Sequence, residues 1–474
     1  MKTWRRGNER DARAPAFQPA LMAEVELGQP LRLLACDPAR DIARYERAIV
    51  LVRLHTHPLG VVEIHRRPSH LTPADLAGEI WRSLAHEILE HLRLDGWSEA
   101  IAPPIEGYAT SSPRPCLERR SQILETAPFV SVVVPTHERA EQLRASLVSI
   151  LALRYPRYEV IVVDNTPRTA ATEKVVKGFM AGSATAVTYL REPRRGASAA
   201  RNRGFRSASG DLIAFADDDV IVDPDWLAAI SEAFEVTHDV GCVTGPVLPL
   251  HFETQAQAWM EQFAEFRTGF TREVFDLRQH RSQRPLYPYN PGVFGSGGSM
   301  AFRKETLQEV GGFDTALGPA TPARSGEELA AFLEVILRGH RLVFEPAAVV
   351  RHAETLDYGA LRRRAYAYGV GLSAYLTKTL VDHPGLVLDL AAKSPHAAYL
   401  MLSPRSPKHA RRSRSFPREL NVVELRGILS GPFAYLLGRA RRRARASGLI
   451  ARATGERAFA RARGTSRQGR GPVQ

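Results

Sequence analysis

Short apolar runs that alternate with helical segments are the feature that most constrains the fold of this chain. The runs 129–135 and 158–164 are almost continuous in apolar residues, as strands buried on both faces of a parallel sheet are. The pattern predicts, in order, strand 129–135, helix 140–153, strand 158–164, helix 172–180, strand 187–190, helix 197–208 and strand 211–216. Strands and helices that alternate at this spacing form βαβ units, so we expect a doubly wound α/β sheet.

Changes in composition divide the rest of the 474-residue chain around this sheet. We expect a flexible N-terminus (1–26), a small α+β domain made of a β-hairpin and a helix (27–100) and a Pro-rich linker (101–128). The α/β domain (129–355), a helical extension (356–402) and a basic tail (403–474) follow. In the small domain, Pro-Leu-Gly at 58–60 predicts the hairpin turn. Thr72 followed by Pro73 predicts the start of a helix that ends near Leu94.

The charge of the chain is concentrated at its C-terminal end. The formal net charge is +13, but residues 403–474 carry 18 Lys and Arg against 3 Asp and Glu. The remainder holds 46 basic and 48 acidic residues and is nearly neutral. This distribution excludes a protein that coats nucleic acid with its whole surface, and no recognition motif accompanies the arginines, so we expect no nucleic-acid partner.

The cysteines and histidines give no metal pattern. Cys36, Cys116 and Cys242 are far apart and form no CxxC pair, which argues against disulfides or a structural zinc site and fits a reducing compartment. We interpret His55, His57 and His65, which lie on or near the predicted hairpin, as surface histidines because their spacing offers no carboxylate partners. With neither an apolar signal segment at the start nor an uncharged apolar stretch of spanning length, we expect a cytoplasmic protein.

Polar residues follow three of the predicted strands, at the edge where ligands bind in open α/β sheets. These residues are Pro135 to Arg139 after the first strand, Asp164 and Asn165 after the second, and Asp217, Asp218 and Asp219 after the fourth. Three adjacent carboxylates repel one another, and oxygen ligands of this kind suit Mg2+ or Mn2+ that also binds a substrate phosphate. The alternative is a solvated acidic loop that caps a helix starting near Asp223.

The order of motifs along the chain resembles the family 2 glycosyltransferases of the GT-A fold. The motifs are Val-Ser-Val-Val-Val-Pro-Thr, Val-Ile-Val-Val-Asp-Asn, Gly-Ala-Ser-Ala-Ala-Arg-Asn-Arg-Gly, Ala-Asp-Asp-Asp, Gly-Ser-Gly-Gly-Ser-Met-Ala-Phe-Arg, Gly-Gly-Phe-Asp, Ser-Gly-Glu-Glu-Leu and Val-Val-Arg-His. They extend over about half of the chain, residues 129–380. The resemblance implies a GT-A mixed sheet and transfer of a sugar, with inversion, from a nucleotide-diphosphate sugar to an acceptor hydroxyl.

The resemblance also implies a donor site at the strand ends. Asp164 would accept a hydrogen bond from the nucleobase, and Arg201 and Asn202 would begin a helix near the pyrophosphate. The implied donor-binding residues are Pro135, Thr136, Glu138, Arg139, Asp164, Arg201, Asn202, Asp217 and Asp218. Capping of the turn and the following helix is the alternative role of Thr136.

A metal site follows from the same resemblance. Asp217 and Asp219 are the outer pair of the family's Asp-x-Asp motif, and His352 fits a third ligand. The implied cofactor is Mn2+ or Mg2+, which would stabilise charge on the departing diphosphate. The alternative for His352 is a structural role.

The catalytic base is predicted at the start of a later helix. The family usually supplies a carboxylate in Gly-Glu-Asp, and this chain has Gly326-Glu327-Glu328, so Glu328 is the base by position and Glu327 binds the acceptor or a backbone N–H. Alternatively, both glutamates only interact favourably with the helix dipole. Gly297, Gly298 and Ser299 are predicted to line the acceptor pocket, because glycines let backbone approach a ligand closely.

The basic tail predicts where the protein is held. Residues 420–445 form an apolar segment that continues into an Arg cluster, which is typical of an element that docks on anionic lipid at the inner face of the cell membrane. A solvated disordered tail is the alternative.

The expected acceptor is a glycan, a lipid-linked group or a small molecule with a hydroxyl. Two other functions are the alternatives: a sugar nucleotidyltransferase, which would carry a Gly-rich basic loop after the first strand, and a non-catalytic nucleotide-sugar binding scaffold.

Overall fold

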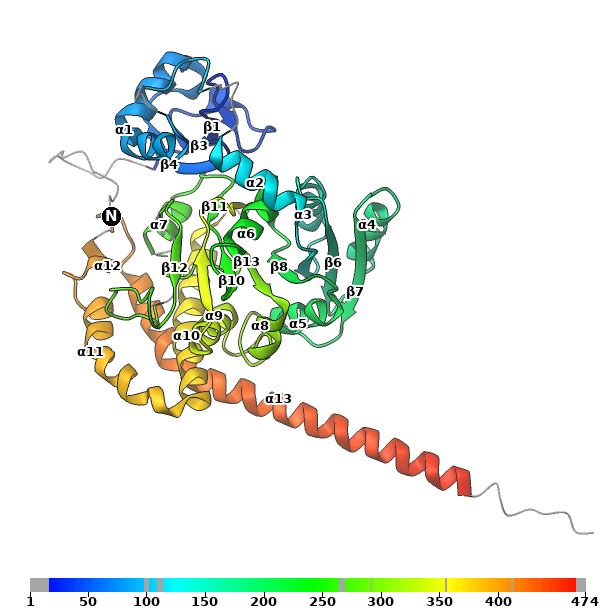
Figure 1. The fold of residues 1–474 in the computed structure, drawn as a ribbon. Coiled ribbons are helices and arrows are strands. Elements are labelled where there is room, and N and C mark those ends of the chain that lie inside the picture. The colour runs from blue at the N-terminus through cyan, green and yellow to red at the C-terminus, as the bar shows by residue number, and fades with distance from the viewer. Residues whose placement is uncertain are drawn as a thin grey trace, which may run out of the picture.

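The structure, a computed structural model, describes residues 17–97, 102–108, 114–263, 269–290, 292–353, 356–410 and 412–465, and the side chains as far as residue 444. Its largest element is an eight-stranded sheet with the order β12-β14-β10-β13-β8-β5-β6-β7 (Figure 1). The strands are β5 (Val130–Thr136), β6 (Tyr158–Asn165), β7 (Ala186–Glu192), β8 (Leu212–Ala216), β10 (Val240–Thr244), β12 (Glu273–Phe275), β13 (Ser299–Arg303) and β14 (Arg341–Phe344).

Helices cover both faces of this sheet, so the predicted doubly wound α/β architecture is confirmed. One core lies under α3 (Ala140–Leu151), α4 (Ala171–Met180) and α6 (Trp226–Phe234). The second core lies under α5 (Ala197–Ser207), α8 (Lys304–Glu309) and α9 (Glu327–Leu337). The sheet is mixed because β13 runs antiparallel to both of its neighbours, β8 and β10.

Pairing of the strands brings the predicted polar ends together. β5 pairs in parallel with both β6 and β8, so the carboxyl ends of these three strands lie at one edge. Beside that edge lies a three-stranded sheet of β11 (Val247–Pro249), β15 (Val350–His352) and β9 (Val220–Val222). β9 follows the Asp217–Asp219 segment directly, and its antiparallel partner β15 ends at His352.

The N-terminal region has a separate sheet and core. Its strands are β1 (Leu21–Glu26), β2 (Leu34–Ala35), β3 (Ala48–Leu54) and β4 (His57–Ile64), and α1 (Pro73–Leu94) packs on them. As predicted, Thr72 caps α1 and its hydroxyl accepts the N–H of Asp75. Two expectations are wrong. Leu21–Glu26 forms a buried strand and so is no part of a flexible terminus, and the hairpin turns at His55 and Thr56, with Pro58 and Gly60 inside β4.

The predicted Pro-rich linker contains a helix, α2 (Pro115–Glu125), which packs against α6. Ion pairs join the N-terminal sheet to the small three-stranded sheet. Arg53 Nη2 lies 2.5 Å from Asp223 Oδ2, and Arg351 Nη2 lies 2.7 Å from Glu24 Oε2. All four side chains lie where β3 and β1 face the small three-stranded sheet. The division of the chain into domains remains our proposal.

The C-terminal region is helical, with α10 (Tyr358–Asp382), α11 (Val387–Leu402), α12 (Pro407–Ala410) and α13 (Glu419–Thr465). The remaining elements are α7 (Gln255–Phe263) and the 3-10 helices η1 (Ile42–Arg44), η2 (Pro68–His70) and η3 (Pro384–Leu386). α13 packs closely on α10, because a Cβ at Gly427 would come within 2.4 Å of the Tyr366 carbonyl oxygen. α13 stays on the body as far as Tyr435 and Arg442, both of which bond to Asp314, and its C-terminal part projects away from the body (Figure 1). Among the described helices, none is long and apolar enough to cross a bilayer.

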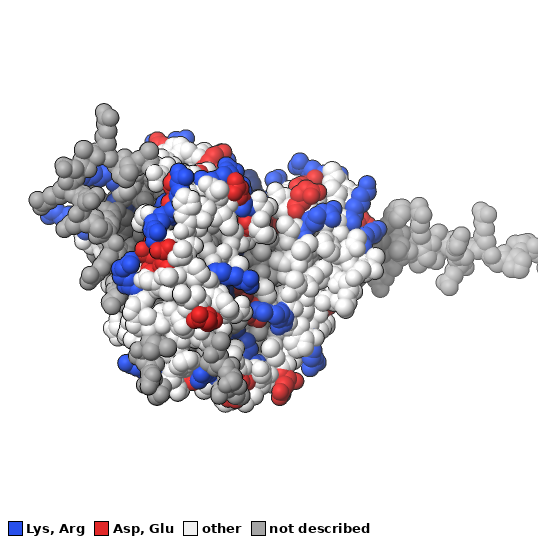
Figure 2. All heavy atoms as spheres, turned by 90° about the horizontal axis from the view of Figure 1, so that it is seen from above, with Lys and Arg blue, Asp and Glu red and all other residues white. Residues whose placement is uncertain are grey.

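The surface of the body carries charges of both signs. On the face seen in Figure 2, Lys and Arg side chains are interspersed with Asp and Glu and separated by uncharged surface. That face therefore has no extended region of one sign, as the nearly neutral composition of residues 1–402 predicts.

Candidate active site

Three carboxylates gather where β8 ends. Arg201, on α5, donates from Nη2 to Asp217 Oδ1 at 3.0 Å. Asp218 turns the other way and accepts from the Thr136 hydroxyl at 2.7 Å and from Arg139 at 3.3 Å. Burial raises the pKa of Asp218 to about 6. The ends of β5 and β8 are thus joined by hydrogen bonds, with Asp218 as a structural link between them.

Asp219 pairs with a histidine that is distant in sequence. His352 Nε2 lies 3.3 Å from Asp219 Oδ1, and Arg139 Nη1 lies 2.7 Å from Asp219 Oδ2. Burial alone would raise the pKa of Asp219, but His352 and Arg139 outweigh it and the pKa is lowered. The antiparallel pairing of β9 with β15 sets this contact, because it places His352 opposite Val220.

Asp164, near the end of β6, is a buried carboxylate with one oxygen that accepts no hydrogen bond from the described residues. The Tyr189 hydroxyl donates to Asp164 Oδ2 at 2.8 Å, whereas Asp164 Oδ1 is buried and has no hydrogen-bond partner among the described residues. Burial raises the pKa of Asp164. A buried acceptor without a donor is costly, so the site is suited to a ligand that donates an N–H or O–H there. Tyr189 was not predicted from the sequence; the parallel register of β6 with β7 is the feature that brings it to Asp164.

Two glutamates begin α9 after Gly326, which has a φ of 93°. Arg201 donates from Nη1 to Glu327 Oε1 at 2.7 Å, so one guanidinium joins Asp217 to Glu327. The Oε2 atoms of Glu327 and Glu328 are buried, and no donor among the described residues reaches them. Burial, followed by the charge of Glu327, raises the pKa of Glu328 well above its ordinary value.

The Gly-rich loop before β13 lies between these two groups of carboxylates. A Cβ at Gly297 would come within 3.3 Å of Glu328 Cγ, and one at Gly298 within 3.8 Å of Asp217 Oδ2. The loop therefore passes close to both the acidic end of β8 and the first turn of α9. A molecule held at this point would have the acidic end of β8 on one side and the buried carboxylate of Glu328, whose pKa is raised, on the other.

Three predicted site residues have other partners. Ser299 was expected in the acceptor pocket, but this is wrong. It is fully buried, its hydroxyl donates to the Ala348 carbonyl and accepts the Trp226 indole N–H, and it is the first residue of β13. The Asn202 side chain exchanges two hydrogen bonds with the backbone of Phe313, so it positions the 311–314 turn. The carboxylate of Glu138 accepts backbone N–H groups of residues 168 and 169.

Comparison with known proteins assigns the class of this chain. A curated relative from Haloferax volcanii, glucosyl-dolichyl phosphate glucuronosyltransferase, is 28% identical over 237 residues, which cover 47% of this chain and 68% of the relative. Pre-mycofactocin glycosyltransferase from Mycobacterium tuberculosis is 27% identical over 256 residues, covering 54% of this chain and 48% of the relative. The chain thus spans about half to two thirds of these two proteins. It is an enzyme of the glycosyltransferase class.

A family model matches the central part of the chain. Residues 131–311 match the model described as Glycosyl transferase family 2. Among solved structures, a mannosyltransferase from Pyrobaculum calidifontis in complex with GDP-Man and Mn2+ is similar, with 22% identity and a TM-score of 0.41 over 69% of this chain and 93% of that one. The matched residues contain the ends of β5, β6 and β8, whereas Glu328 and His352 lie beyond them.

Proposed function

We propose that this chain transfers a sugar from a nucleotide-diphosphate sugar to an acceptor hydroxyl, with inversion at the anomeric carbon and with Mn2+ or Mg2+ bound at Asp217, Asp219 and His352. The observation that carries the proposal is the position of the Gly297–Gly298 loop, where a Cβ at Gly297 would come within 3.3 Å of Glu328 Cγ and one at Gly298 within 3.8 Å of Asp217 Oδ2. The two groups that an inverting transfer needs, one at the leaving diphosphate and one at the attacking hydroxyl, therefore lie on two sides of one loop.

The residues at the end of β8 fit a divalent cation. His352 Nε2 and Asp219 Oδ1 are 3.3 Å apart, close to the roughly 3 Å that separates neighbouring ligand atoms of one octahedral ion. Asp217 keeps about a third of its side chain exposed, at 35%, and so stays open to a cation that also binds a substrate phosphate. When bound, the cation would neutralise charge that develops on the departing diphosphate.

Donor recognition is proposed along the ends of β5 and β6. The buried Asp164 Oδ1 would accept an N–H of the nucleobase, which supplies the partner that this atom lacks among the described residues. Pro135, Thr136 and Arg139 flank it at the end of β5, and Arg139 also reaches Asp219. Arg201 holds Asp217 in place and brings positive charge toward the diphosphate.

Glu328 is the proposed general base. As the acceptor oxygen attacks the anomeric carbon, its proton moves to a carboxylate oxygen of Glu328, and the bond between the anomeric carbon and the diphosphate oxygen breaks. Glu327 is held by Arg201 and remains beside the base, where its charge strengthens the proton affinity of Glu328. Glu327 is therefore a positioning residue in this proposal.

The acceptor class follows from the relatives and from the tail. The curated relatives include an enzyme named for transfer to glucosyl-dolichyl phosphate and a succinoglycan biosynthesis protein, so we propose a glycan or lipid-linked acceptor in glycoconjugate synthesis. The side chains of Leu429, Phe433, Leu436 and Leu437 on α13 are exposed, and four arginines follow within residues 439–443. We propose that this segment holds the enzyme on an anionic, cytoplasmic membrane face.

A donor screen tests the enzymatic proposal. Purified chain is incubated with UDP-, GDP- and dTDP-sugars and Mn2+, with and without a panel of glycan and lipid-linked acceptors, and release of nucleoside diphosphate is measured. We expect one nucleotide class to be turned over, loss of turnover with EDTA, and loss in Glu328→Gln. The matched control is Glu305→Gln, an exposed glutamate on α8 that should retain full activity. Equal turnover by Glu328→Gln, or none by the unsubstituted chain with any donor, contradicts the proposal.

A further inference from the structure

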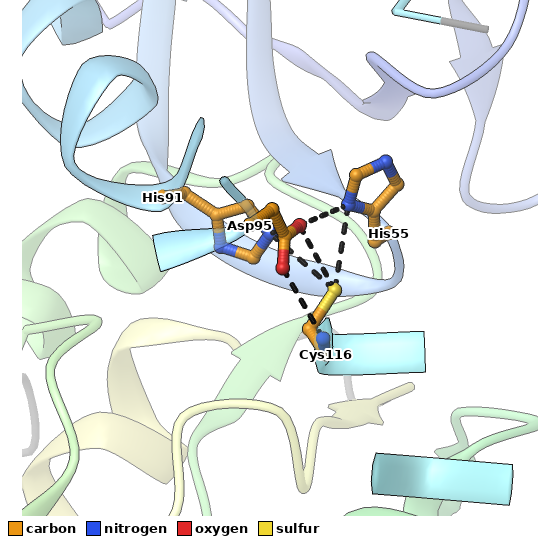
Figure 3. Close-up of side chains that lie close together, drawn as sticks. All are labelled: His55, His91, Asp95 and Cys116. Atoms are coloured by element: carbon orange, nitrogen blue, oxygen red, sulfur yellow. Dashed lines mark hydrogen bonds and ion pairs between the residues drawn. The ribbon is translucent and has the colours of Figure 1, made fainter. Parts of the chain in front are cut away.

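A second group of metal-ligating side chains lies in the N-terminal region, outside the candidate active site. It consists of His55, His91, Asp95 and Cys116, which come from three separate elements and point toward one another (Figure 3). His55 belongs to the turn between β3 and β4, His91 and Asp95 to the last turn and the C-cap of α1, and Cys116 to the first turn of α2. The ligand atoms of all four lie within 4.8 Å of one another.

The group is shielded from solvent. His55 and Asp95 are 8% and 3% exposed, and His91 and Cys116 are partly buried. The sequence-based interpretation of His55 as a surface histidine is therefore wrong. The cysteine spacing, which argues against a structural zinc site, does not show that Cys116 lies beside two histidines and a carboxylate. His65 is exposed as expected. His55 and His91 could not be linked to Asp95 and Cys116 by spacing, because the group depends on how α1 and α2 pack around the hairpin turn.

The distances within the group fit one small ion. Asp95 Oδ2 lies 2.7 Å from His55 Nδ1, 3.2 Å from His91 Nε2 and 3.0 Å from Cys116 Sγ. Cys116 Sγ lies 3.4 Å from His55 Nδ1 and 3.9 Å from His91 Nε2. Zinc bonds to N, O and S are about 2.0–2.3 Å long, so tetrahedral ligand atoms are about 3.3–3.7 Å apart. The two separations from Cys116 Sγ lie close to that range, and those from Asp95 Oδ2 are shorter than it by up to about 0.6 Å, so an outward shift of the carboxylate by about that much would admit the ion.

Hydrogen bonding alone gives a poor account of this arrangement. Two imidazole nitrogens and a thiol converge on a single oxygen, Asp95 Oδ2, although one carboxylate oxygen offers about two lone pairs. The second oxygen, Oδ1, accepts the backbone N–H of Cys116 and is thereby fixed. Oδ2 is left pointing into the centre of the group, as a monodentate metal ligand would be.

We propose that His55, His91, Asp95 and Cys116 bind one Zn2+ as a structural site. Two imidazoles, a carboxylate and a thiolate form a complete tetrahedral set with no open position, which is the pattern of structural rather than catalytic zinc. The thiolate and the carboxylate together carry two negative charges, which the divalent ion balances. The thiolate also distinguishes this site chemically from the Asp217–Asp219 edge, whose oxygen and imidazole ligands suit harder cations.

The zinc would fasten α2 to the N-terminal sheet. Cys116 lies at the start of α2, and one turn later Arg120 bonds to the Thr56 hydroxyl beside His55 and to Glu232 on α6 at 3.3 Å. His55 and Thr56 have φ values of 53° and 68°, an uncommon conformation for residues other than glycine. A metal bond at His55 would stabilise this turn. The ion would therefore determine how the N-terminal sheet, α2 and α6 are held together.

The test measures metal in the full chain, purified through a tag that lacks histidine and cysteine. We expect about one zinc per chain by elemental analysis, retained through dialysis. Cobalt substitution should give a thiolate-to-cobalt charge-transfer absorption, which an ion at Asp217 and Asp219 cannot produce because no sulfur lies in that ligand set. This absorption should vanish in Cys116→Ser and persist in Cys36→Ser. His91→Ala should lose zinc, whereas the matched control His86→Ala, exposed on the same helix, should keep it.

Each result of these experiments either supports or overturns the zinc proposal. A folded chain that binds no zinc after reconstitution overturns the proposal, as does a thiolate-to-cobalt absorption that survives Cys116→Ser. If the ligand variants fail to fold, the cobalt spectra of the unsubstituted chain and of Cys36→Ser decide the question: a thiolate band in both supports the site, and its absence overturns it. Because these readouts need no donor or acceptor, they stand apart from the test of glycosyl transfer.

Discussion

Arg201 and Glu327 form a buried ion pair, with Nη1 and Oε1 2.7 Å apart and side chains that are only 6% and 4% exposed. The same guanidinium bonds to Asp217, so α5 connects the end of β8 to the first turn of α9. The pair therefore ties the proposed cation-binding edge to the helix that carries the proposed base. Breaking it should affect both stability and catalysis.

Arg201→Met should destabilise the chain by about 3–5 kcal/mol, because it leaves Glu327 as an uncompensated buried charge. Removing both charges, in Arg201→Met with Glu327→Gln, should recover part of that loss. Chemical denaturation of the three proteins measures the difference. A single variant as stable as the unsubstituted chain would show that the pair is not buried as described.

Glu328→Gln should lower kcat by roughly 100- to 10,000-fold, the usual contribution of a general base. Donor binding should change little, since the proposed donor-binding residues Asp164 and Arg139 bond to Tyr189 and Asp219 at the ends of other strands. Isothermal titration with the preferred nucleoside diphosphate, alongside steady-state kinetics, separates the two effects. Glu328→Asp keeps the charge and should retain more activity than the glutamine variant; the reverse order would argue against proton transfer at this position.

The pH dependence of transfer should report the raised pKa of Glu328. The base must be deprotonated to act, and burial together with Glu327 raises its pKa well above the ordinary value for glutamate. Activity should therefore fall as the pH is lowered through this raised pKa, earlier than an exposed glutamate would allow. In Glu327→Gln the neighbouring charge is gone, so the acid limb of the kcat profile should move to lower pH. An unmoved limb would assign it to another group.

Asp219→Asn should weaken metal binding more than donor binding. Asp219 pairs with His352 and Arg139, and the amide would supply one neutral oxygen in place of a carboxylate. We expect the Mn2+ concentration for half-maximal activity to rise at least tenfold, with a matching effect in His352→Ala. Metal titrations of activity measure it. Unchanged metal requirements in both variants would place the cation elsewhere.

Membrane association should depend on the exposed apolar residues of α13. Leu429 and Phe433 are 75% and 76% exposed and lie one helical turn apart. Replacing both with Glu should reduce sedimentation with anionic vesicles several-fold, whereas neutral vesicles should bind neither form. Met180→Glu, at an exposed apolar site on α4, is the matched control. Equal vesicle binding by the double variant would contradict docking through α13.

The central fold was largely predictable because its signals are local. The apolar runs at β5, β6 and β8, and the acidic residues that follow them, mark both the strands and the edge they share. The features that the sequence did not predict depend on packing between segments that are distant in the chain. The side chain of Ser299 faces Trp226 because of where β13 begins, and Tyr189 reaches Asp164 only through the β6–β7 register. Likewise, the interpretation of His55 failed because its partners lie 36, 40 and 61 positions away.

The pairing of β15 with β9 has a consequence for how small an active piece of this protein can be. The stretch that matches the family model ends at residue 311. A fragment cut there would keep the donor-facing strand ends but would lose α9, with Glu328, and β15, with His352. Such a fragment would also leave β9 without the neighbour that it bonds to. With the roles proposed for Glu328 and His352, the shortest active unit is therefore expected to run through residue 352, past the end of the family match.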